Sequence, residues 1–372
     1  MSELSDHVES AVLIDHHVHG CWAADLDTQA GDRVRFESAL TEADTDPVTE
    51  VGAGFDSQVG FAVRAHCARL LDLERHVGAD EYLARRTALG EAEVSRRFLQ
   101  AAGVSDWLVD TGFAAGLVDT DEMTAVSGGS THEVVRLEEV AEQAAAAPGD
   151  YAEAFDEILA ERAAGAVATK SVLAYRGGFP GDLGDPPPAL VDIAAQRWRD
   201  AGGTRLTDRI LLRFGLHRAL RLGKPLQFHV GFGDRDCDLH AANPLLLNDF
   251  LRMSGDTPIM LLHCYPYERE AGYLAQAHQN VYLDGGLSIT HLGARATPFV
   301  GRLLELAPFR KILYSSDGAG PAEFHHLGAR LWRTAMTRVL EGFVADDEWS
   351  AADARRVVDL IASENARRVY RL

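Results

Sequence analysis

The sequence predicts an α/β fold, a (β/α)8 TIM barrel with a helical insertion after its first strand, and three observations lead to this prediction. Eight short apolar runs alternate along the chain with longer amphipathic segments, as strands alternate with helices in such barrels. Most of these runs are continuously apolar, as expected for parallel strands that are buried on both faces. The chain has 372 residues, of which 47% are hydrophobic, so it can fill a large core.

The predicted elements follow one another in the order of a barrel. The eight strands cover residues 11–15, 105–113, 132–138, 165–175, 225–231, 259–265, 281–286 and 311–318. Segments with helical periodicity cover 139–146, 150–164, 206–222, 244–254, 268–278 and 296–307, and a last one covers 346–368. A stretch rich in Gly and Pro, residues 177–192, is expected to form a loop after the fourth strand.

One interval is too long for an ordinary connection, because about ninety residues separate the first two strands. Residues 57–102 are periodic and rich in charge, so we expect a helical insertion or small subdomain beside the barrel mouth. The chain would then consist of a barrel, residues 1–56 and 103–372, and the insertion. The insertion could be a lid or an interface. We expect a homodimer, since exposed apolar stripes on helices need a surface that covers them.

The composition limits the class of partner. The chain has 36 Lys and Arg against 56 Asp and Glu, a formal net charge of −20, which disfavours nucleic acid and anionic membranes. Four scattered cysteines without a CxxC pair do not fit a zinc ribbon or a disulfide scaffold. The polar N-terminus is unlike a signal peptide and no apolar run reaches the length of a membrane span, so we expect a soluble, cytoplasmic protein.

Metal-binding residue types gather where the predicted strands end, which is the end at which barrel enzymes place their active groups. These residues are His17, His19, His229, His263 and Asp317. In the stretch SAVLIDHHVHGCW, His17 and His19 are two positions apart on a strand, so both can reach one cation, whereas His16 points the other way. Each histidine alone could be a hydrogen-bonded core residue. Together, imidazoles and one carboxylate with an open position for water have the form of a catalytic zinc site.

The ordered motifs resemble the amidohydrolase superfamily of metal-dependent barrels. D-x-H-x-H on the first strand, single histidines ending strands five and six, and S-S-D-G on strand eight carry this resemblance. TKSVLAYRGG, LLHCYPYEREAGYLA, VYLDGG and KILYSSDG are similar, more narrowly, to the amidohydrolase-2 branch and its nodulin-like domains associated with glutamine synthetase. The resemblance implies one Zn²⁺ or Mn²⁺ ion on His17, His19, His229 and Asp317. It makes His263 a further ligand or a proton donor, and Asp317 a general base toward water.

Three further residues are expected around this centre. In binuclear members of the superfamily a strand-four lysine is carboxylated and bridges two metals, so the resemblance leaves a second ion open. Here SVLAY follows Lys170, which would place it too deep for a bridge, and we expect it to reach toward substrate or water. Arg176 suits a substrate carboxylate because its planar guanidinium can bind both oxygens. Tyr175 and Arg176 are the predicted substrate-binding residues, although both could instead anchor the following loop.

These expectations describe a metal-dependent hydrolase that cleaves the C–N amide bond of a small carboxylate-bearing substrate. The predicted catalytic residues are Asp317, His263 and Lys170. The resemblance to synthetase-associated domains suggests a γ-glutamyl amide and a functional link to a glutamine-synthetase-like enzyme. The alternatives are a single-metal decarboxylase of a small unsaturated or aromatic acid, a sugar-acid isomerase, and a non-catalytic scaffold or regulator of such a synthetase.

Overall fold

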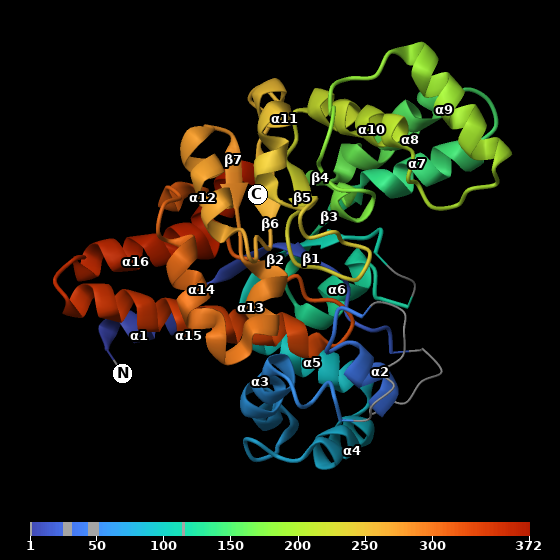
Figure 1. Cartoon of the computed structure of the whole chain (residues 1–372). Coiled ribbons are helices and arrows are strands. Elements are labelled where there is room, and N and C mark those ends of the chain that lie inside the picture. The colour runs from blue at the N-terminus through green and yellow to red at the C-terminus, as the bar shows by residue number, and fades with distance from the viewer. Residues whose placement is uncertain (1, 25–31, 44–51, 114–115) are drawn as a thin grey trace.

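The computed structural model describes residues 2–24, 32–43, 52–113 and 116–372. Within them, seven parallel strands form one curled sheet in which sequence neighbours are also spatial neighbours (Figure 1). The strands are β1 (Leu13–Val18), β2 (Val104–Asp110), β3 (Ser130–Arg136), β4 (Ala168–Ser171), β5 (Leu226–His229), β6 (Ile259–Leu262) and β7 (Val281–Leu283). This arrangement, with helices in the connections, is consistent with a TIM barrel.

The prediction of a regular eighth strand at 311–318 is wrong. Phe309–Lys311 form a short 3-10 helix (η5), and residues 313–319 have no regular secondary structure and make only scattered backbone hydrogen bonds. The Leu313 N–H donates to the carbonyl of Leu283 in β7, and the His16 N–H donates to the carbonyl of Tyr314. The Ser316 N–H instead donates to the Asp15 carboxylate, at 3.0 Å, so a side chain takes a donor that a regular ladder would need. The segment nevertheless links β7 to β1.

Helices fill the connections and cover the sheet, and most match predicted helical segments. The α-helices outside residues 57–102 are α1 (Glu3–Ser10), α2 (Arg33–Ser38), α6 (Thr120–Ser127), α7 (Leu137–Ala146), α8 (Tyr151–Gly165), α9 (Pro188–Asp200), α10 (Arg209–Leu222), α11 (Asn248–Met253), α12 (Glu268–Ala277), α13 (Gly286–Leu292), α14 (Ala296–Leu303), α15 (Ala322–Ala345), α16 (Ala351–Asp359) and α17 (Asn365–Tyr370). Short 3-10 helices are η2 (Leu173–Tyr175), η3 (Pro244–Leu247) and η4 (Gly293–Arg295), and η6 (Leu360–Glu364) is a π-helix. Helix α9 begins inside the predicted 177–192 loop, with Pro188 in its first turn.

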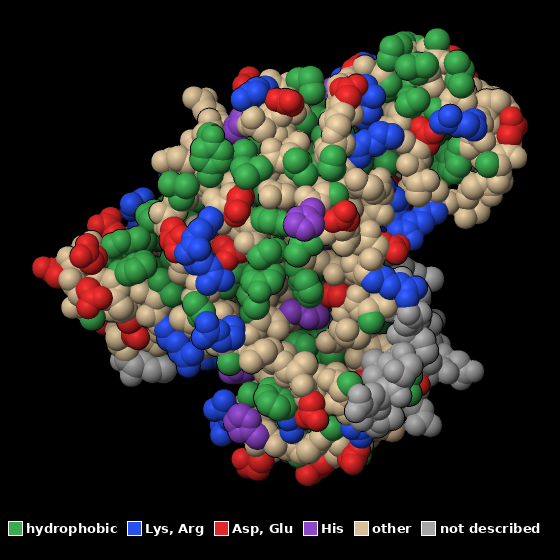
Figure 2. Space-filling model, in the orientation of Figure 1, with side chains coloured by type: hydrophobic (Ala, Val, Ile, Leu, Met, Phe, Trp, Pro, Cys, Tyr) green, Lys and Arg blue, Asp and Glu red, His purple; other side chains and the backbone are tan. Residues whose placement is uncertain are grey.

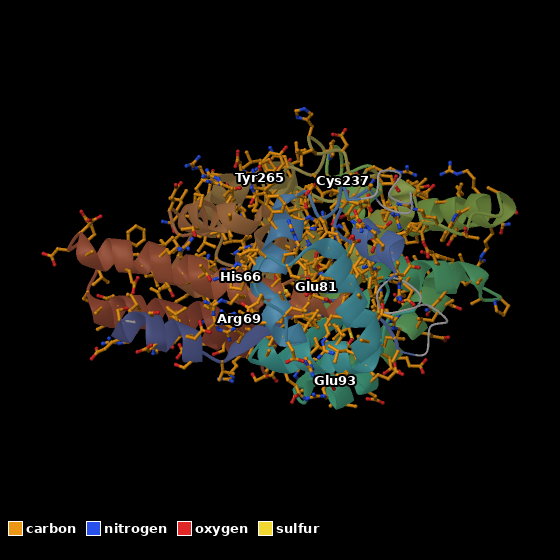
Figure 3. All side chains as sticks on the ribbon, turned by 90° about the horizontal axis from the view of Figure 1, so that it is seen from below. His66, Arg69, Glu81, Glu93, Cys237 and Tyr265 are labelled. Carbon is orange, nitrogen blue, oxygen red and sulfur yellow. The ribbon has the colours of Figure 1, made fainter. Side chains whose placement is uncertain are left out.

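Residues 57–102 form α3 (Gln58–His66), η1 (Ala68–Leu71), α4 (Ala79–Leu89) and α5 (Glu91–Ala101). Figure 3 shows His66, Glu81 and Glu93 of this segment, with Glu93 at the edge opposite Cys237 and Tyr265. The buried apolar side chains of the segment belong to the same buried cluster as those around the sheet. The division of the chain into barrel and insertion stays a prediction, and residues 1, 25–31, 44–51 and 114–115 of the predicted barrel ranges lie outside the described residues.

A separate apolar cluster fills the interior of the curled sheet. It includes Leu108 of β2, Val134 of β3 and Ala168 of β4, and Tyr370 of α17 belongs to it as well. Side chains two positions further along a strand point to the same side. The positions that follow these three toward the strand ends are Asp110, Arg136 and Lys170, so the apolar interior gives way to a layer of charged side chains.

The surface in Figure 2 carries charged side chains of both signs, with hydrophobic side chains between them. Among the described residues, no helix is both long enough and apolar enough to cross a membrane.

Candidate metal centre

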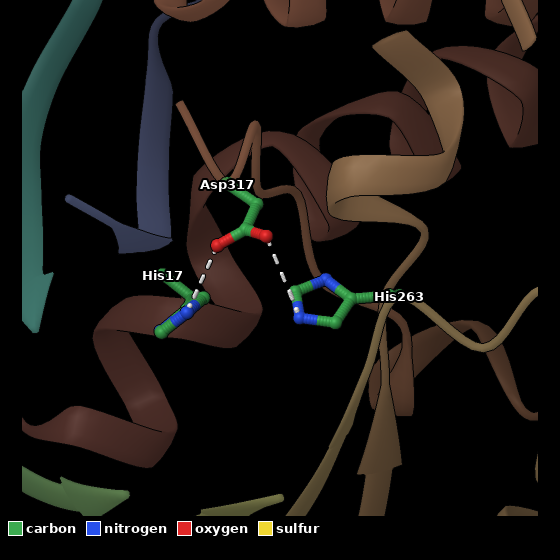
Figure 4. Close-up of side chains that lie close together, drawn as sticks. All are labelled: His17, His263 and Asp317. Atoms are coloured by element: carbon green, nitrogen blue, oxygen red, sulfur yellow. Dashed lines mark ion pairs between the residues drawn. The ribbon is translucent and has the colours of Figure 1, made fainter. Parts of the chain in front are cut away.

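One carboxylate lies among three imidazoles at the carboxyl ends of the strands. Oδ1 of Asp317 is 3.1 Å from Nε2 of His17 and 3.4 Å from Nε2 of His19. Its Oδ2 is 3.6 Å from Nε2 of His263, as Figure 4 shows together with the His17 contact. The structure therefore brings together four of the five predicted ligands, from β1 and the residue after it, the turn after β6 and the segment before α15.

The protonation states of these groups suit a divalent cation. Burial, together with nearby Lys170, lowers the pKa of His17 to about 3, and burial also lowers the pKa of His263. Burial alone would raise the pKa of Asp317, but the surrounding imidazoles hold it well below its ordinary value. Neither ring nitrogen of His263 has a hydrogen-bond partner within the described chain. Neutral imidazoles around an ionised carboxylate are the ligand types that catalytic zinc sites use.

Hydrogen bonds on the far side of each ring orient the first two histidines. Nδ1 of His17 lies 2.8 Å from the amide oxygen of Gln227, whose amide nitrogen donates to the His16 carbonyl and to the Tyr370 hydroxyl. Nδ1 of His19 lies 3.1 Å from the carbonyl oxygen of Asp110. Both partner oxygens only accept, so Nδ1 of each histidine is the donor and Nε2 faces the carboxylate. Nε2 of His17 also lies 2.9 Å from Nζ of Lys170.

Two turns that carry site residues have an unusual backbone held by buried carboxylates. His263 and Asp317 both adopt positive φ, 69° and 52°, a conformation that non-glycine residues seldom take and that clusters at functional sites. The Asp284 carboxylate accepts the N–H of His263, at 2.7 Å. The Asp15 carboxylate accepts both the N–H and the hydroxyl of Ser316, beside Asp317. Asp15 thus supports the site through the backbone.

His16 and His229 lie near the Asp317 cluster, but within the described chain neither ring forms an ion pair with the Asp317 carboxylate. His16 is not part of the cluster, because its ring nitrogens contact the Tyr370 hydroxyl at 2.9 Å and Asp284 at 2.7 Å. Nε2 of His229 lies 3.0 Å from the Tyr175 hydroxyl, and its ring centroid is 4.6 Å from that of His263. His229 is therefore adjacent to the cluster, and its role as a ligand stays a prediction.

Lys170 is closer to the site than its sequence context indicated. Strand β4 ends at Ser171 and η2 begins at Leu173, so Lys170 lies at the end of the strand, and the expectation that it lies too deep is wrong. Its Nζ is 2.9 Å from Nε2 of His17 and 3.8 Å from Oδ2 of Asp110. Burial lowers the pKa of this ammonium, while the carboxylates of Asp110 and Asp317 act in the opposite direction.

The sequence reasoning missed four residues that build the site. Arg136 donates two hydrogen bonds to Oδ2 of Asp110, at 2.6 and 3.1 Å, which fixes the carboxylate beside Lys170. Both residues lie at the ends of their strands, the same signal that identified the histidines. Gln227 stands two positions before His229 in an otherwise apolar run, and Asp284 follows β7 directly. A polar residue at such positions is itself a signal of the site.

A cavity of about 540 Å³ opens over the cluster. Its wall includes His19, His263, Asp317 and Lys170, and further out Tyr175 and Arg176. Arg176 is half-buried, has no ion-pair partner among the described residues, and keeps a buried Nε without a hydrogen bond. Burial and the neighbouring Arg205 lower its pKa. Glu138, in the first turn of α7, accepts hydrogen bonds from the Ser171 hydroxyl and the Val172 N–H, just beyond Lys170.

Comparisons with known proteins show the family to which this chain belongs. A family model described as amidohydrolase matches residues 14–372. Protein fluG of Emericella nidulans is 33% identical over 221 residues, which are 55% of this chain and 26% of that protein, so the chain spans about a quarter of this relative. A Lactobacillus casei protein proposed to be a metal-dependent hydrolase is 28% identical, with a TM-score of 0.85 over 100% of this chain and 98% of that one.

A uronate isomerase from Bacillus halodurans shares the fold, with a TM-score of 0.69 and 13% identity over 99% of this chain and 95% of that one. The family match spans nearly the whole chain and includes every residue of the carboxylate–imidazole cluster. The chain therefore belongs to the amidohydrolase family, in the amidohydrolase-2 branch.

Proposed function

We propose that this protein is a metal-dependent hydrolase that cleaves the C–N amide bond of a small, carboxylate-bearing substrate. The observation that carries the proposal is the ionised Asp317 carboxylate among neutral imidazoles at the base of a cavity. One Zn²⁺ or Mn²⁺ ion would be held by His17, His19, His229 and Asp317. When bound there, such a cation polarises a carbonyl group and lowers the pKa of water.

The chain's own residues have distinct parts in this proposal. Asp317 accepts the proton of the attacking water and delivers it to the departing amine, as a carboxylate at the base of the cavity can do. His263, whose two ring nitrogens have no hydrogen-bond partner among the described residues, is a further ligand or the proton donor to the carbonyl oxygen. Lys170 lies beside His17 and within reach of the same space, so it belongs to the catalytic group.

The position of Arg176 is the reason for proposing a carboxylate on the substrate. It is a half-buried cation in the cavity wall without a carboxylate partner among the described residues, and a guanidinium forms strong paired hydrogen bonds with a carboxylate. Tyr175, next to it, places its hydroxyl against His229.

A γ-glutamyl amide, and a link to a glutamine-synthetase-like enzyme, are the specific form of this proposal, and they rest on the family resemblance alone. A homodimer and a cytoplasmic location likewise stay predictions.

The test is a product analysis on protein loaded with Zn²⁺ or Mn²⁺. We expect γ-glutamyl amides to release amine and glutamate, and the Asp317→Asn variant to lose this turnover. Asp346→Asn, an exposed site at the end of α15, is the matched control and should keep it. Release of carbon dioxide from small unsaturated or aromatic acids, with no amide cleavage, would establish the decarboxylase alternative instead.

A further inference from the structure

The cavity lining carries charged side chains of both signs. Besides Asp317, it includes the acidic residues Glu42, Asp234 and Asp236 and the basic residues Arg136, Lys170, Arg176 and Arg205. Burial and the carboxylates of Glu42 and Asp234 raise the pKa of the Tyr175 hydroxyl well above its ordinary value, so both carboxylates act on the same part of the cavity. The cavity can therefore meet a ligand with an anion and a cation at once.

Glu42 lines the cavity in contact with His291. It lies four residues after the end of α2, and its Oε1 is 3.2 Å from Nε2 of His291 in α13. The His291 ring in turn packs edge-on against Phe232, with centroids 5.4 Å apart. The Glu42 side chain is 26% exposed, so the carboxylate is partly withdrawn from water and still open to the cavity. A carboxylate in this setting binds a cation more strongly than one on an open surface.

Arg176 is the arginine of the cavity lining that remains available to a ligand. Arg136 is held by Asp110 through paired hydrogen bonds, and Arg205 forms an ion pair with Asp236 at 2.8 Å. Arg176 has no such partner within the described chain, and its guanidinium makes only a 3.4 Å contact with the Tyr175 carbonyl.

We propose that Glu42 binds a positively charged group of the substrate while Arg176 binds its carboxylate, so that the enzyme takes a zwitterion of the amino-acid class. This inference rests on the proposed function only in assigning this cavity to the substrate. A carboxylate–ammonium hydrogen bond in a partly dehydrated wall favours the zwitterion over its analogue without an ammonium group by about tenfold or more. Glu42 is thus a residue that determines specificity and takes no part in bond cleavage.

The experiment compares ligands that differ only in the ammonium group. Dissociation constants are measured by calorimetry on the metal-loaded full chain for two pairs, L-glutamate with glutarate and L-norvaline with pentanoate. We expect the wild type to prefer the ammonium-bearing member of each pair by about tenfold or more. In Glu42→Gln this preference should fall to about twofold or less, while the affinity for glutarate stays the same or rises. Glu42→Asp, which keeps the charge, should retain part of the preference.

Glu81→Gln, on α4 and outside the cavity lining, is the control and should bind all four ligands as the wild type does (Figure 3). Equal affinity within both pairs, an unchanged preference in Glu42→Gln, or binding of neither pair would overturn the inference. Binding requires no turnover, so the two proposals can fail separately. A Glu42-dependent preference without amide cleavage would support the role of Glu42 and reject the hydrolase. Amide cleavage without this preference would support the hydrolase and reject the role of Glu42.

Discussion

His17 and Asp317, which come from opposite ends of the chain, touch through both side chain and backbone. Nε2 of His17 is 3.1 Å from Oδ1 of Asp317, and the Asp317 N–H donates to the His17 carbonyl at 3.2 Å. This contact lies where the segment after β7 meets β1. The contacts that close the curled sheet therefore also bring Asp317 to the histidines. A cation bound to both His17 and Asp317 would stabilise the folded state, because it would bind only when these two segments are together.

Asp317→Asn should abolish tight cation binding. The amide keeps the shape of the side chain but removes the negative charge that three imidazoles surround. Loss of an outer partner of a metal ligand typically costs 10- to 100-fold in metal affinity, so loss of the ligand itself should cost more than about 100-fold. Calorimetric titration with Zn²⁺ and Mn²⁺ measures this, and Asp346→Asn should bind as the wild type does. An unchanged affinity in Asp317→Asn would exclude the proposed centre.

Gln227→Leu should weaken cation binding without touching a ligand. It removes the acceptor that orients His17 and leaves the buried Nδ1 of that ring unpaired. We expect an affinity loss of about 10- to 100-fold and a loss of about 1–3 kcal/mol in the free energy of unfolding. Titration calorimetry and urea denaturation measure the two effects. Gln196→Leu on the exposed face of α9 should change neither, and a stability loss without an affinity loss would show that Gln227 is only structural.

The histidines of the site were predictable because two simple rules act on them. Strand alternation places His17 and His19 together, and barrel strands end at a common edge. The same rules applied to Asp110 and Arg136, but their mutual pairing requires knowing that β2 and β3 are adjacent in register. The strand that carries Lys170 was predicted to run on to residue 175, and this error has a different cause. Val172 leaves the extended conformation, with φ −102° and ψ 32°, and no apolar pattern marks that change.

Other parts of the structure depend on contacts between distant segments. Whether residues 312–317 pair as a strand is decided by the Asp15 carboxylate, which takes the Ser316 N–H. The helices of residues 57–102 were visible from periodicity, but their attachment was not. Arg86 of α4 reaches Glu323 at the start of α15, and both side chains are fully buried. One sequence gives no indication of such a pair, because each residue alone is typical of a solvated helix face.

Arg86→Met should strongly destabilise the fold. Arg86 is completely buried and pairs with Glu323 at 2.6 Å and Glu91 at 3.0 Å, while Tyr82 donates to the same Glu323 carboxylate. Without the guanidinium, two buried carboxylates lose their counter-charge. Breaking a buried ion pair in this way costs about 3–5 kcal/mol in the free energy of unfolding, which urea denaturation measures.

The matched control is Arg96→Met on α5, whose partner Glu93 lies at the surface in the same segment. It should leave the unfolding midpoint nearly unchanged, because exposed ion pairs contribute little. If Arg86→Met were as mild as Arg96→Met, the buried network would not be what attaches residues 57–102 to α15.

Acidification should destabilise the protein through His326. Burial lowers the pKa of this residue to about 4, from an ordinary value of 6.5. Between these two pKa values His326 is protonated in the unfolded chain and neutral in the folded chain. The free energy of unfolding therefore falls as the pH falls from about 6.5 to about 4. The loss at pH 5 relative to pH 7.5 is about 2 kcal/mol for one such group.

Replacing His326 by Phe should remove this share of the pH dependence. The ring already packs against Phe98, with centroids 5.8 Å apart, so an apolar ring has compatible surroundings. Urea denaturation at pH 7.5 and pH 5 gives the difference for each protein, and the His326→Phe difference should be smaller by about 2 kcal/mol. His240→Phe, at an exposed position, should keep the wild-type difference. Equal differences in all three would assign the acid sensitivity to other groups.

Lys170→Met should separate a one-ion centre from a two-ion centre. Nζ of Lys170 lies 2.9 Å from Nε2 of His17, an atom that the proposed cation would need. As an ammonium, Lys170 would repel that cation, and its removal should leave about one ion per chain bound as tightly or more tightly, with turnover reduced about 100-fold or more. As a carboxylated lysine it would bridge two ions, and its removal would release one. Metal content with and without added bicarbonate measures the difference.

Lys224→Met, whose Nζ donates only to backbone carbonyls among the described residues, is the control. Two ions in the wild type and one in Lys170→Met would contradict the single-ion prediction and make Lys170 a ligand.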